Sequence, residues 1–372
     1  MRTRSHGRSW AVLARLFAVL ALLGLVWVGC IDTTESPVAP GTDKTSPENE
    51  LNAANPRVQE VMAVQDRHTP ELMGMPGVVG TATGLTRDGR PAILVLTEKN
   101  QLDTELPAEI DGVPVVQEVT GRIVAMDGGA AHKVIQTPPI QLGTSGGWRY
   151  DLANGYCCGG TLGSLINKGG AQYVLSNYHV FWADIVNGGN GRVATAGDPV
   201  VQPGLIDVGC VAANAQNVAT LSGSGSLPGA NVDAGYAQVI SGMVRTDGAI
   251  LEVGTISATT QAAALNQAVK KSGRTTGLSR SKVSGLNATV SIAYDNECAG
   301  GAAFTKTFTG QIVIANRGSK FLAGGDSGSL MVQDVTTNPR AVGLLYAGSF
   351  TSAIANPINA VLSWAGATMV GN

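Results

Sequence analysis

From residue 133 to the C-terminus, short β-prone runs follow one another with Gly, Asn and Pro between them. The runs are GGTLGSLI, AQYVLSNYHVFW, VDAGYAQVI, ILEVGTIS, SGLNATVSIAY, QIVIAN, SLMVQDV and AVGLLYAG. Many short strands at this spacing predict a barrel or a sandwich, not an alternation of strands and helices. One helix is expected near the end, in PINAVLSWAGATM. The fold class predicted for this region is therefore all-β.

The composition limits the classes of partner that the protein can bind. Only 14% of the 372 residues are charged and the net charge is −2, so no electrostatic footprint for nucleic acid is present. The chain shows no repeat of fixed period, no P-loop and no GxGxxG after a strand. We expect no nucleic-acid partner, no cofactor, and a monomer.

The N-terminus is typical of an exported protein. Residues 1–30 begin with several arginines and continue in an apolar run over 16–29, which is shorter than the roughly 20 residues that span a bilayer. Gly29 and Cys30 resemble a bacterial lipobox, which predicts lipidation of Cys30, whereas Trp27 in place of the usual Leu leaves ordinary cleavage and secretion open. Residues 31–55 are rich in Pro, Ser, Thr and acids and are predicted to be a flexible tether.

Residues 56–131 are predicted to form a small α+β domain. A broadly helical rhythm comes first, carried by Val58, Val61, Met62, Gln65 and Leu72. GVVGTATGL and AILVLTE flank TRDGRP, which indicates a hairpin, and VPVVQEVTGRIVAM predicts a further strand. His68 is interpreted as a surface or helix-end residue. A second domain is expected over 132–372, with residues 132–148 leading into it.

The stretch GGDSGS, residues 324–329, admits two interpretations. It is either a tight turn before a strand or a nucleophile, Ser327, whose flanking glycines leave backbone N–H groups open to a reacting oxygen. His179 is the one histidine after residue 133 and follows an apolar strand, so it is the candidate base for Ser327. Taken alone, His179 would instead be read as a histidine packed near Tyr178 and Trp182.

A third member, an acid, is expected between His179 and Ser327. Asp233 is favoured because NVDAGYAQVI places it at the head of an alternating strand, and Asp207 is the alternative. The other aspartates considered are Asp184, Asp198, Asp247 and Asp295.

The order of these pieces carries a family resemblance. CCGGTLGSLINKGGAQYVLSNYHV, followed much later by GGDSGSL, resembles the trypsin/chymotrypsin family of serine proteases over roughly residues 140–365, although LSNYH replaces the family's AAH. The resemblance implies two six-stranded β-barrels and a serine endopeptidase acting on proteins or peptides. His179, Asp233 and Ser327 would form the triad, and the N–H groups of Gly325 and Ser327 the oxyanion hole.

Two neighbouring features are expected to be structural. Asp326 is predicted to be buried beneath the oxyanion loop. In the zymogen branch of the family this Asp pairs with a newly freed N-terminus, but PIQLGTSGG stands where an activation site would be, which puts such activation in doubt. Residues 270–285, with GRTTG, are predicted to be a hairpin that opens the second barrel and has no catalytic role.

The four cysteines of this region predict disulfides. Cys157, Cys158, Cys210 and Cys298 allow two bridges in three pairings, and the adjacent Cys157 and Cys158 are expected to bond elsewhere. There is no CxxC pair and no second histidine in the region, so no metal site is expected.

The substrate pocket is predicted by counting in the family's register. Six residues before Ser327 stands Phe321, where trypsin-like members place an acid, and the other wall falls in LLYAGSF, with Tyr346, Ala347 and Gly348. This register predicts a preference for uncharged, small or apolar residues before the scissile bond. Two alternatives to an active protease remain: a catalytically silent protease-fold module that binds at the cell envelope, and a protease that residues 56–126 keep latent.

Overall fold

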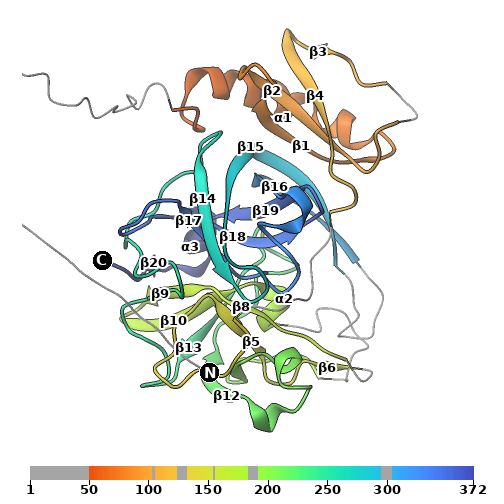
Figure 1. The fold of residues 1–372 in the computed structure, drawn as a ribbon. Helices are drawn as coiled ribbons and strands as arrows, with labels where there is room; N and C mark the ends of the chain where they lie inside the picture. Colours follow the sequence, from red (N-terminus) through yellow and green to blue (C-terminus); the bar gives the residue numbers. More distant parts are fainter. Residues whose placement is uncertain (1–49, 103–104, 124–131, 154–155, 183–191, 295–303) are drawn as a thin grey trace, which may run out of the picture. The chain divides into compact units, whose positions relative to one another are not determined.

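The computed structural model describes residues 50–102, 105–123, 132–153, 156–182, 192–294 and 304–372 (Figure 1). The predicted signal segment, Cys30 and most of the predicted tether lie outside the described residues. Within the described ranges, no helix is both long and apolar enough to cross a membrane.

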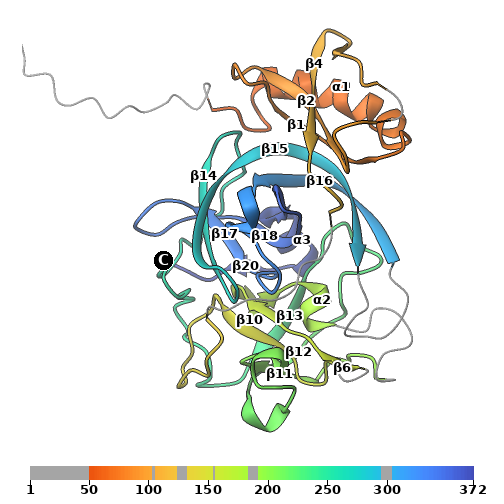
Figure 2. The same ribbon diagram turned by 45° about the vertical axis from the view of Figure 1, so that its right-hand side comes forward.

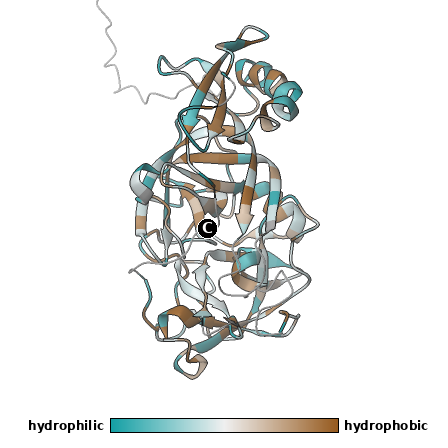
Figure 3. Cartoon of the chain, turned by 90° about the vertical axis from the view of Figure 1, so that its right-hand side faces the viewer, coloured by the Kyte–Doolittle hydropathy of each residue, from teal (hydrophilic) through white to brown (hydrophobic). Residues whose placement is uncertain are grey.

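Helix α1 (Pro56–Met73) begins at a clear sequence signal. The side chain of Asn55 accepts a hydrogen bond from the N–H of Arg57 at 3.0 Å, and Pro56 occupies the first turn, where its missing N–H costs nothing. Both hydrophobic and hydrophilic residues lie around its turns (Figure 3). The buried side is formed by Val58, Val61, Val64, Gln65 and Leu72, so the predicted helix is confirmed.

Four strands accompany α1 in the N-terminal unit (Figure 1). They are β1 (Val78–Leu85), β2 (Pro91–Thr97), β3 (Glu109–Ile110) and β4 (Val113–Val119). β1 and β2 form the predicted hairpin, and β4 runs parallel to β2. This sheet does not end within the unit, because β1 also pairs antiparallel with β15, a strand of the C-terminal region.

The second half of the C-terminal region is a closed ring of six strands. The strands are β14 (Ala268–Gly273), β15 (Gly277–Tyr294), β16 (Phe304–Ala315), β17 (Leu330–Gln333), β18 (Ala341–Gly348) and β19 (Ser352–Pro357). They follow the order β14-β17-β18-β19-β16-β15, and a further pairing of β14 with β15 closes the ring. β15 curves strongly along its 18 residues (Figure 2). The predicted hairpin of residues 270–285 is the β14–β15 pair.

The first half forms a separate sheet of eight strands, in the order β20-β9-β10-β13-β12-β11-β5-β8. Its members are β5 (Thr144–Trp148), β8 (Gly160–Leu162), β9 (Ser164–Lys168), β10 (Ala171–Ser176), β11 (Pro199–Gln202), β12 (Gln216–Leu221), β13 (Gly235–Val239) and β20 (Thr368–Met369). Only Gly163 separates β8 from β9, so the sheet curls back on itself. A Cβ at Gly163 would lie 2.0 Å from the carbonyl oxygen of Gly328, and this position therefore tolerates no side chain.

Short elements complete the chain. The helices α2 (Tyr178–Phe181) and α3 (Ile358–Ala365), the 3-10 turns η2 (Leu205–Asp207), η3 (Ala212–Asn214) and η4 (Arg317–Ser319), and the small pair β6 (Leu152–Ala153) and β7 (Tyr156–Cys157) lie between the strands. α3 is the helix predicted near the C-terminus. The strand expected in ILEVGTIS is wrong: Ile250 and Gly254 instead close a tight turn, in which Glu252 has a φ of 63° and Gly254 of 87°.

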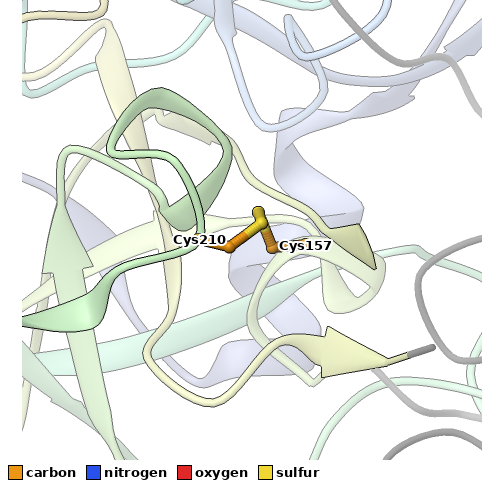
Figure 4. Close-up of a disulfide and its surroundings, with 2 residues drawn as sticks. All are labelled: Cys157 and Cys210. Carbon is orange, nitrogen blue, oxygen red and sulfur yellow. A yellow bond between two sulfur atoms is a disulfide. The ribbon is translucent and has the colours of Figure 1, made fainter. Parts of the chain in front are cut away.

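The structure contains a disulfide between two of the cysteines that were predicted to form bridges. Cys157, at the end of β7, is bonded to Cys210, which follows η2 (Figure 4). Cys158 is also in a disulfide, and Cys298 lies outside the described residues. The prediction that Cys157 does not bond its neighbour Cys158 is confirmed, because Cys157 is bonded to Cys210.

Breaking the Cys157–Cys210 bridge is expected to destabilise the fold without abolishing it. The bridge joins residues 53 apart and restricts the unfolded chain, so the double change Cys157→Ser and Cys210→Ser should lower the free energy of unfolding by about 2–4 kcal/mol. Urea unfolding of the variant and of the oxidised wild type measures this difference. An unchanged midpoint would mean that the bridge contributes nothing to stability.

Candidate active site

His179 lies at the point where a buried strand gives way to a short helix. β10 ends at Ser176, Asn177 has the extended conformation that precedes a helix, and His179 is in the only turn of α2. The side-chain amide of Asn177 donates to the carbonyl oxygen of Asp233 at 2.8 Å. This bond ties the end of β10 to the residues that precede β13.

Asp233 is fully buried and is surrounded by donors. Oδ2 lies 2.7 Å from Nδ1 of His179 and also accepts the hydroxyl of Tyr294 at 2.7 Å. Oδ1 accepts the N–H of Tyr178 at 2.7 Å and that of His179 at 3.4 Å. A buried carboxylate is tolerable when its oxygens are satisfied in this way, and the same contacts fix the orientation of the imidazole ring.

Three tyrosines near Asp233 are held in their neutral form. Burial, and to a smaller extent the charge of Asp233, raises the pKa of Tyr178 to about 12. Burial likewise raises the pKa of Tyr294 and of Tyr346 well above the ordinary value, with Asp233 again adding to the effect. The Tyr294 hydroxyl therefore keeps its proton, and remains a donor to Asp233, throughout the neutral and mildly alkaline range.

Ser327 lies in a glycine-framed turn just before β17. The flanking residues Gly325 and Gly328 have φ values of 83° and 91°, a conformation that other residues rarely adopt. A Cβ at Gly325 would also lie 2.6 Å from Nη1 of Arg274. Among the hydrogen bonds between described residues, none has the N–H of Gly325 or of Ser327 as its donor.

The Ser327 turn and the His179 segment meet at β8. The N–H of Thr161 donates to the carbonyl oxygen of Ser327 at 2.8 Å, and the neighbouring Gly160 faces both Ser327 and Val180, the residue after His179. Ser327 is 2% exposed, and its Oγ lies 3.4 Å from the carbonyl oxygen of Tyr346. β8 therefore brings the nucleophile candidate and the base candidate to one region of the fold.

The alternative acid, Asp207, lies elsewhere. It accepts two hydrogen bonds of 2.7 Å from the guanidinium group of Arg274, and a third from Ser145. These partners are Arg274 of the GRTTG turn and Ser145, and His179 is not among them, so the structure places Asp233, and not Asp207, against the imidazole.

The predicted pocket residues are not all brought together. Tyr346 and Ala347 belong to one buried apolar cluster, together with Tyr294 and Ile354. Phe321 packs in a different cluster, with Leu322 and Met331. Ile123, at the end of the N-terminal unit, is 1% exposed and packs in the cluster of Tyr346.

Sequence reasoning missed two residues that complete the surroundings of Asp233. Tyr294 donates to its carboxylate, and the side chain of Asn356 accepts its backbone N–H at 2.8 Å. Tyr294 belongs to β15 and Asn356 to β19, both strands of the six-stranded ring. They lie 61 and 123 residues away from Asp233 in the sequence, and no local motif marks either one. In the part of the chain that is described, no group of three or more His, Cys, Asp or Glu residues is placed to hold a metal ion.

No family model and no curated protein matches the chain. Among solved structures, it is similar to a glutamic acid-specific serine protease, with 20% identity over 62% of this chain and 100% of that chain, and a TM-score of 0.41.

Two further structures are Thermobifida fusca protease A (22% identity, 63% of this chain, 99% of that chain, TM-score 0.40) and Cellulomonas bogoriensis chymotrypsin (19%, 63%, 99% and 0.38).

Proposed function

We propose that the chain is a serine endopeptidase that hydrolyses peptide bonds through Ser327, His179 and Asp233. The observation that carries this proposal is the buried Asp233–His179 pair, in which Oδ2 lies 2.7 Å from Nδ1. Such a pair leaves Nε2 as the proton-accepting nitrogen of the ring. In this view residues 132–372 form two six-stranded barrels of the chymotrypsin type, preceded by the small α+β unit. In the first barrel β8 and β9, which only Gly163 separates, count as one bent strand, and β20 is an addition at the edge.

The chemistry assigns one role to each residue. Oγ of Ser327 attacks the substrate carbonyl while Nε2 of His179 takes its proton, and the protonated ring then donates that proton to the leaving amine. Asp233 holds the tautomer and stabilises the imidazolium. Water repeats the sequence on the acyl-enzyme and releases the second product. For the attack step Oγ of Ser327 turns from the carbonyl oxygen of Tyr346 toward Nε2 of His179 by rotation about one side-chain bond. The contact between a nucleophile and its base often tightens only when substrate binds.

The N–H groups of Gly325 and Ser327 suit an oxyanion hole. Neither donates to another described group, and the left-handed backbone at Gly325 determines how its peptide group is turned. A pair of fixed donors costs no reorganisation when the carbonyl oxygen becomes negative, and each donor is typically worth about 3–4 kcal/mol of transition-state stabilisation.

The cross-link supports export of the protein. Disulfides persist in oxidising compartments, and Cys157–Cys210 is formed here. We propose that the protein is exported, and that it is either anchored through lipid on Cys30 or secreted after ordinary cleavage.

A latent form of the protease is the second candidate. Ile123 packs beside Tyr346 and Ala347, and the carbonyl oxygen of Ile123 accepts the N–H of Ala293 at 3.4 Å. In a latent form, Ile123 at the end of the N-terminal unit would thus cover part of the proposed substrate pocket, which includes Tyr346 and Ala347. A silent binding module has no comparable observation in its favour, because Ser327, His179 and Asp233 are all present.

Peptide hydrolysis by the purified chain tests the function and separates these candidates. A site for a specific protease, inserted between Ile123 and His132, allows the chain to be cut after folding. An active protease digests a denatured protein before the cut, a latent one does so only after the cut, and a silent module does neither. The Ser327→Ala variant, cut in the same way, is the control for contaminating proteases.

Cleavage is expected to favour uncharged, small or apolar residues before the scissile bond. Phe321 stands where an acid would be needed, and the neighbouring acid Asp326 is held by Lys271. A substrate Lys or Arg would then be buried without a counter-charge, which is costly. Profiling on a proteome-derived peptide library measures the preference, and strong enrichment of Lys or Arg at that position would show that the register is wrong.

A further inference from the structure

The two walls of the proposed substrate pocket come from different parts of the chain. One wall contains Phe321 and Leu322, which lie between η4 and the Ser327 turn, and the other is the end of β18 with the turn that follows it. Leu345 of β18 packs in the same buried cluster as Phe321 and Leu322, whereas Tyr346 packs in another cluster. Successive side chains of a strand point to opposite faces, so one face of β18 is turned toward the Phe321 wall.

Asn316 joins the two walls through its side chain. It is fully buried, and its Oδ1 accepts the N–H of Phe321 at 3.0 Å and that of Leu322 at 2.9 Å. Its Nδ2 donates to the carbonyl oxygen of Leu322 at 2.9 Å and to that of Ser349, the residue after β18, at 2.7 Å. These four partners use both donors of the amide and both lone pairs of its oxygen. Because backbone N–H groups only donate and carbonyls only accept, the partners also fix which way the amide is turned.

The side chain of Asn316 does not take the role that its place in the sequence favours. An Asn directly before a helix commonly caps it, and Asn316 precedes η4, but it makes no capping hydrogen bond. Its backbone N–H donates to the carbonyl oxygen of Thr351 at 2.6 Å, and the N–H of Gly318 donates to that of Phe350 at 3.0 Å. The turn that contains Asn316 is thus fastened to the loop after β18, and its side chain extends this attachment to the other wall.

The two walls differ in what else holds them. The carbonyl oxygen of Phe321 accepts the hydroxyl of Ser279 at 2.8 Å, so the first wall has a second anchor on β15. Among the described residues, no group other than Asn316 donates to the carbonyl oxygen of Ser349. Residues 316–356 contain no cysteine, so no disulfide joins the two walls. The distance between the walls at this end therefore depends on Asn316.

We propose that Asn316 is a positioning residue of the substrate pocket: it holds Phe321 and Leu322 at a fixed distance from Ser349, and thereby limits the size of the residue accepted before the scissile bond. This inference rests on the proposed serine-protease function. A small, uncharged side chain fits between the walls as they stand. A larger one has to part them, which breaks a bond of Asn316 and leaves a buried backbone group without its partner.

The test uses the full chain and its variants, cut between Ile123 and His132 if activity needs the cut. Two peptide anilides are compared that differ only in the residue before the scissile bond, alanine in one and phenylalanine in the other. Asn316→Asp keeps the shape and still accepts the N–H of Phe321, but the ionised carboxylate cannot donate to Ser349. The ratio of kcat/KM for the alanine peptide to that for the phenylalanine peptide should fall by about tenfold or more, within the range that a change in the fit of an apolar pocket produces.

A general loosening of the fold is separated from this effect by a control. For the alanine peptide the loss in Asn316→Asp should lie in KM, with kcat within about threefold, because Ser327 and His179 are unchanged. Gln202 is also fully buried, and its amide accepts the N–H of Gln136 at 3.1 Å and donates to the carbonyl oxygen of Val134 at 2.9 Å, in the first sheet. Gln202→Ala should lower Tm and leave the ratio within about twofold, because distant sites that share no partner act independently.

Asn316→Ala removes all four bonds and should shift the ratio in the same direction, so whichever Asn316 variant folds decides the question. An unchanged ratio, an equal change in Gln202→Ala, or a wild-type preference for the phenylalanine peptide overturns the role of Asn316 while the protease function stands. Failure of both variants to fold means that Asn316 supports the fold as a whole, and it overturns the role as well. A wild-type chain that hydrolyses nothing, cut or uncut, overturns both proposals.

Discussion

Replacing Ser327 with alanine is expected to lower kcat for peptide hydrolysis by about a million-fold while the fold is retained. The hydroxyl is the proposed nucleophile, and no other group can form the acyl-enzyme in its place. His179→Ala should cost about as much, because the serine is then left without a base, and the two changes together should cost little more than either alone. Steady-state hydrolysis of a peptide substrate measures kcat, and thermal unfolding verifies the fold.

Matched controls come from the same fold. Ser164 is as deeply buried as Ser327, and His68 lies on the surface of α1 beside Asp111. Ser164→Ala and His68→Ala should retain kcat within a few-fold. Normal turnover by Ser327→Ala, or an equal loss in Ser164→Ala, would contradict the assignment of the nucleophile.

Replacing Asp233 with asparagine is expected to lower kcat by about 10,000-fold at neutral pH. The amide oxygen can still accept the N–H of Tyr178, and the amide NH2 group in the place of Oδ2 can donate to the hydroxyl oxygen of Tyr294, so the local geometry should persist. It cannot stabilise the imidazolium, however, and an amide N–H turned toward Nδ1 would favour the wrong tautomer of His179. Kinetics in the neutral range, with Tm measured alongside, reveal the loss.

Asp198 supplies the control for this change. It is nearly buried and accepts hydrogen bonds from Trp148 at 3.0 Å and Arg192 at 3.1 Å, so an Asp198→Asn variant also disturbs an internal carboxylate. We expect some loss of stability but nearly unchanged kcat per folded molecule. If Asp198→Asn lowers kcat as strongly as Asp233→Asn, the effect of Asp233 is structural and not specific to His179.

Local sequence signals predict the start of the first helix and identify the main candidate residues of the active site. Asn55–Pro56 marks the start of α1, and at Gly325 and Gly328 the GGDSGS stretch has a backbone conformation that residues other than glycine rarely adopt. The sequence favours Asp233 over Asp207 because Asp233 heads an alternating strand, and the structure places Asp233 against His179. Each of these inferences depends on the conformational preference of a few adjacent residues, which a sequence displays directly.

Contacts that join distant strands could not be predicted in the same way. Tyr294 and Lys271 contact carboxylates more than 50 residues away in the sequence, and their neighbours in sequence give no sign of these contacts. The same is true of β1, which reads as part of a self-contained unit but pairs with β15. ILEVGTIS has the composition of a strand, yet the backbone turns at Glu252, whose carboxylate accepts the N–H of Leu278. Tertiary contacts override propensity at such positions.

Labelling with a fluorophosphonate tests the central claim most directly, because this reagent phosphonylates a serine only when the hydroxyl is activated. The folded chain, before and after cutting between Ile123 and His132, is treated with the reagent and digested, and the modified residue is located by mass spectrometry. We predict one adduct per molecule, on Ser327, that disappears when the protein is unfolded first and in the His179→Ala variant. No adduct on Ser327 in either form, or an adduct on another serine that persists in Ser327→Ala, would contradict the proposed active site.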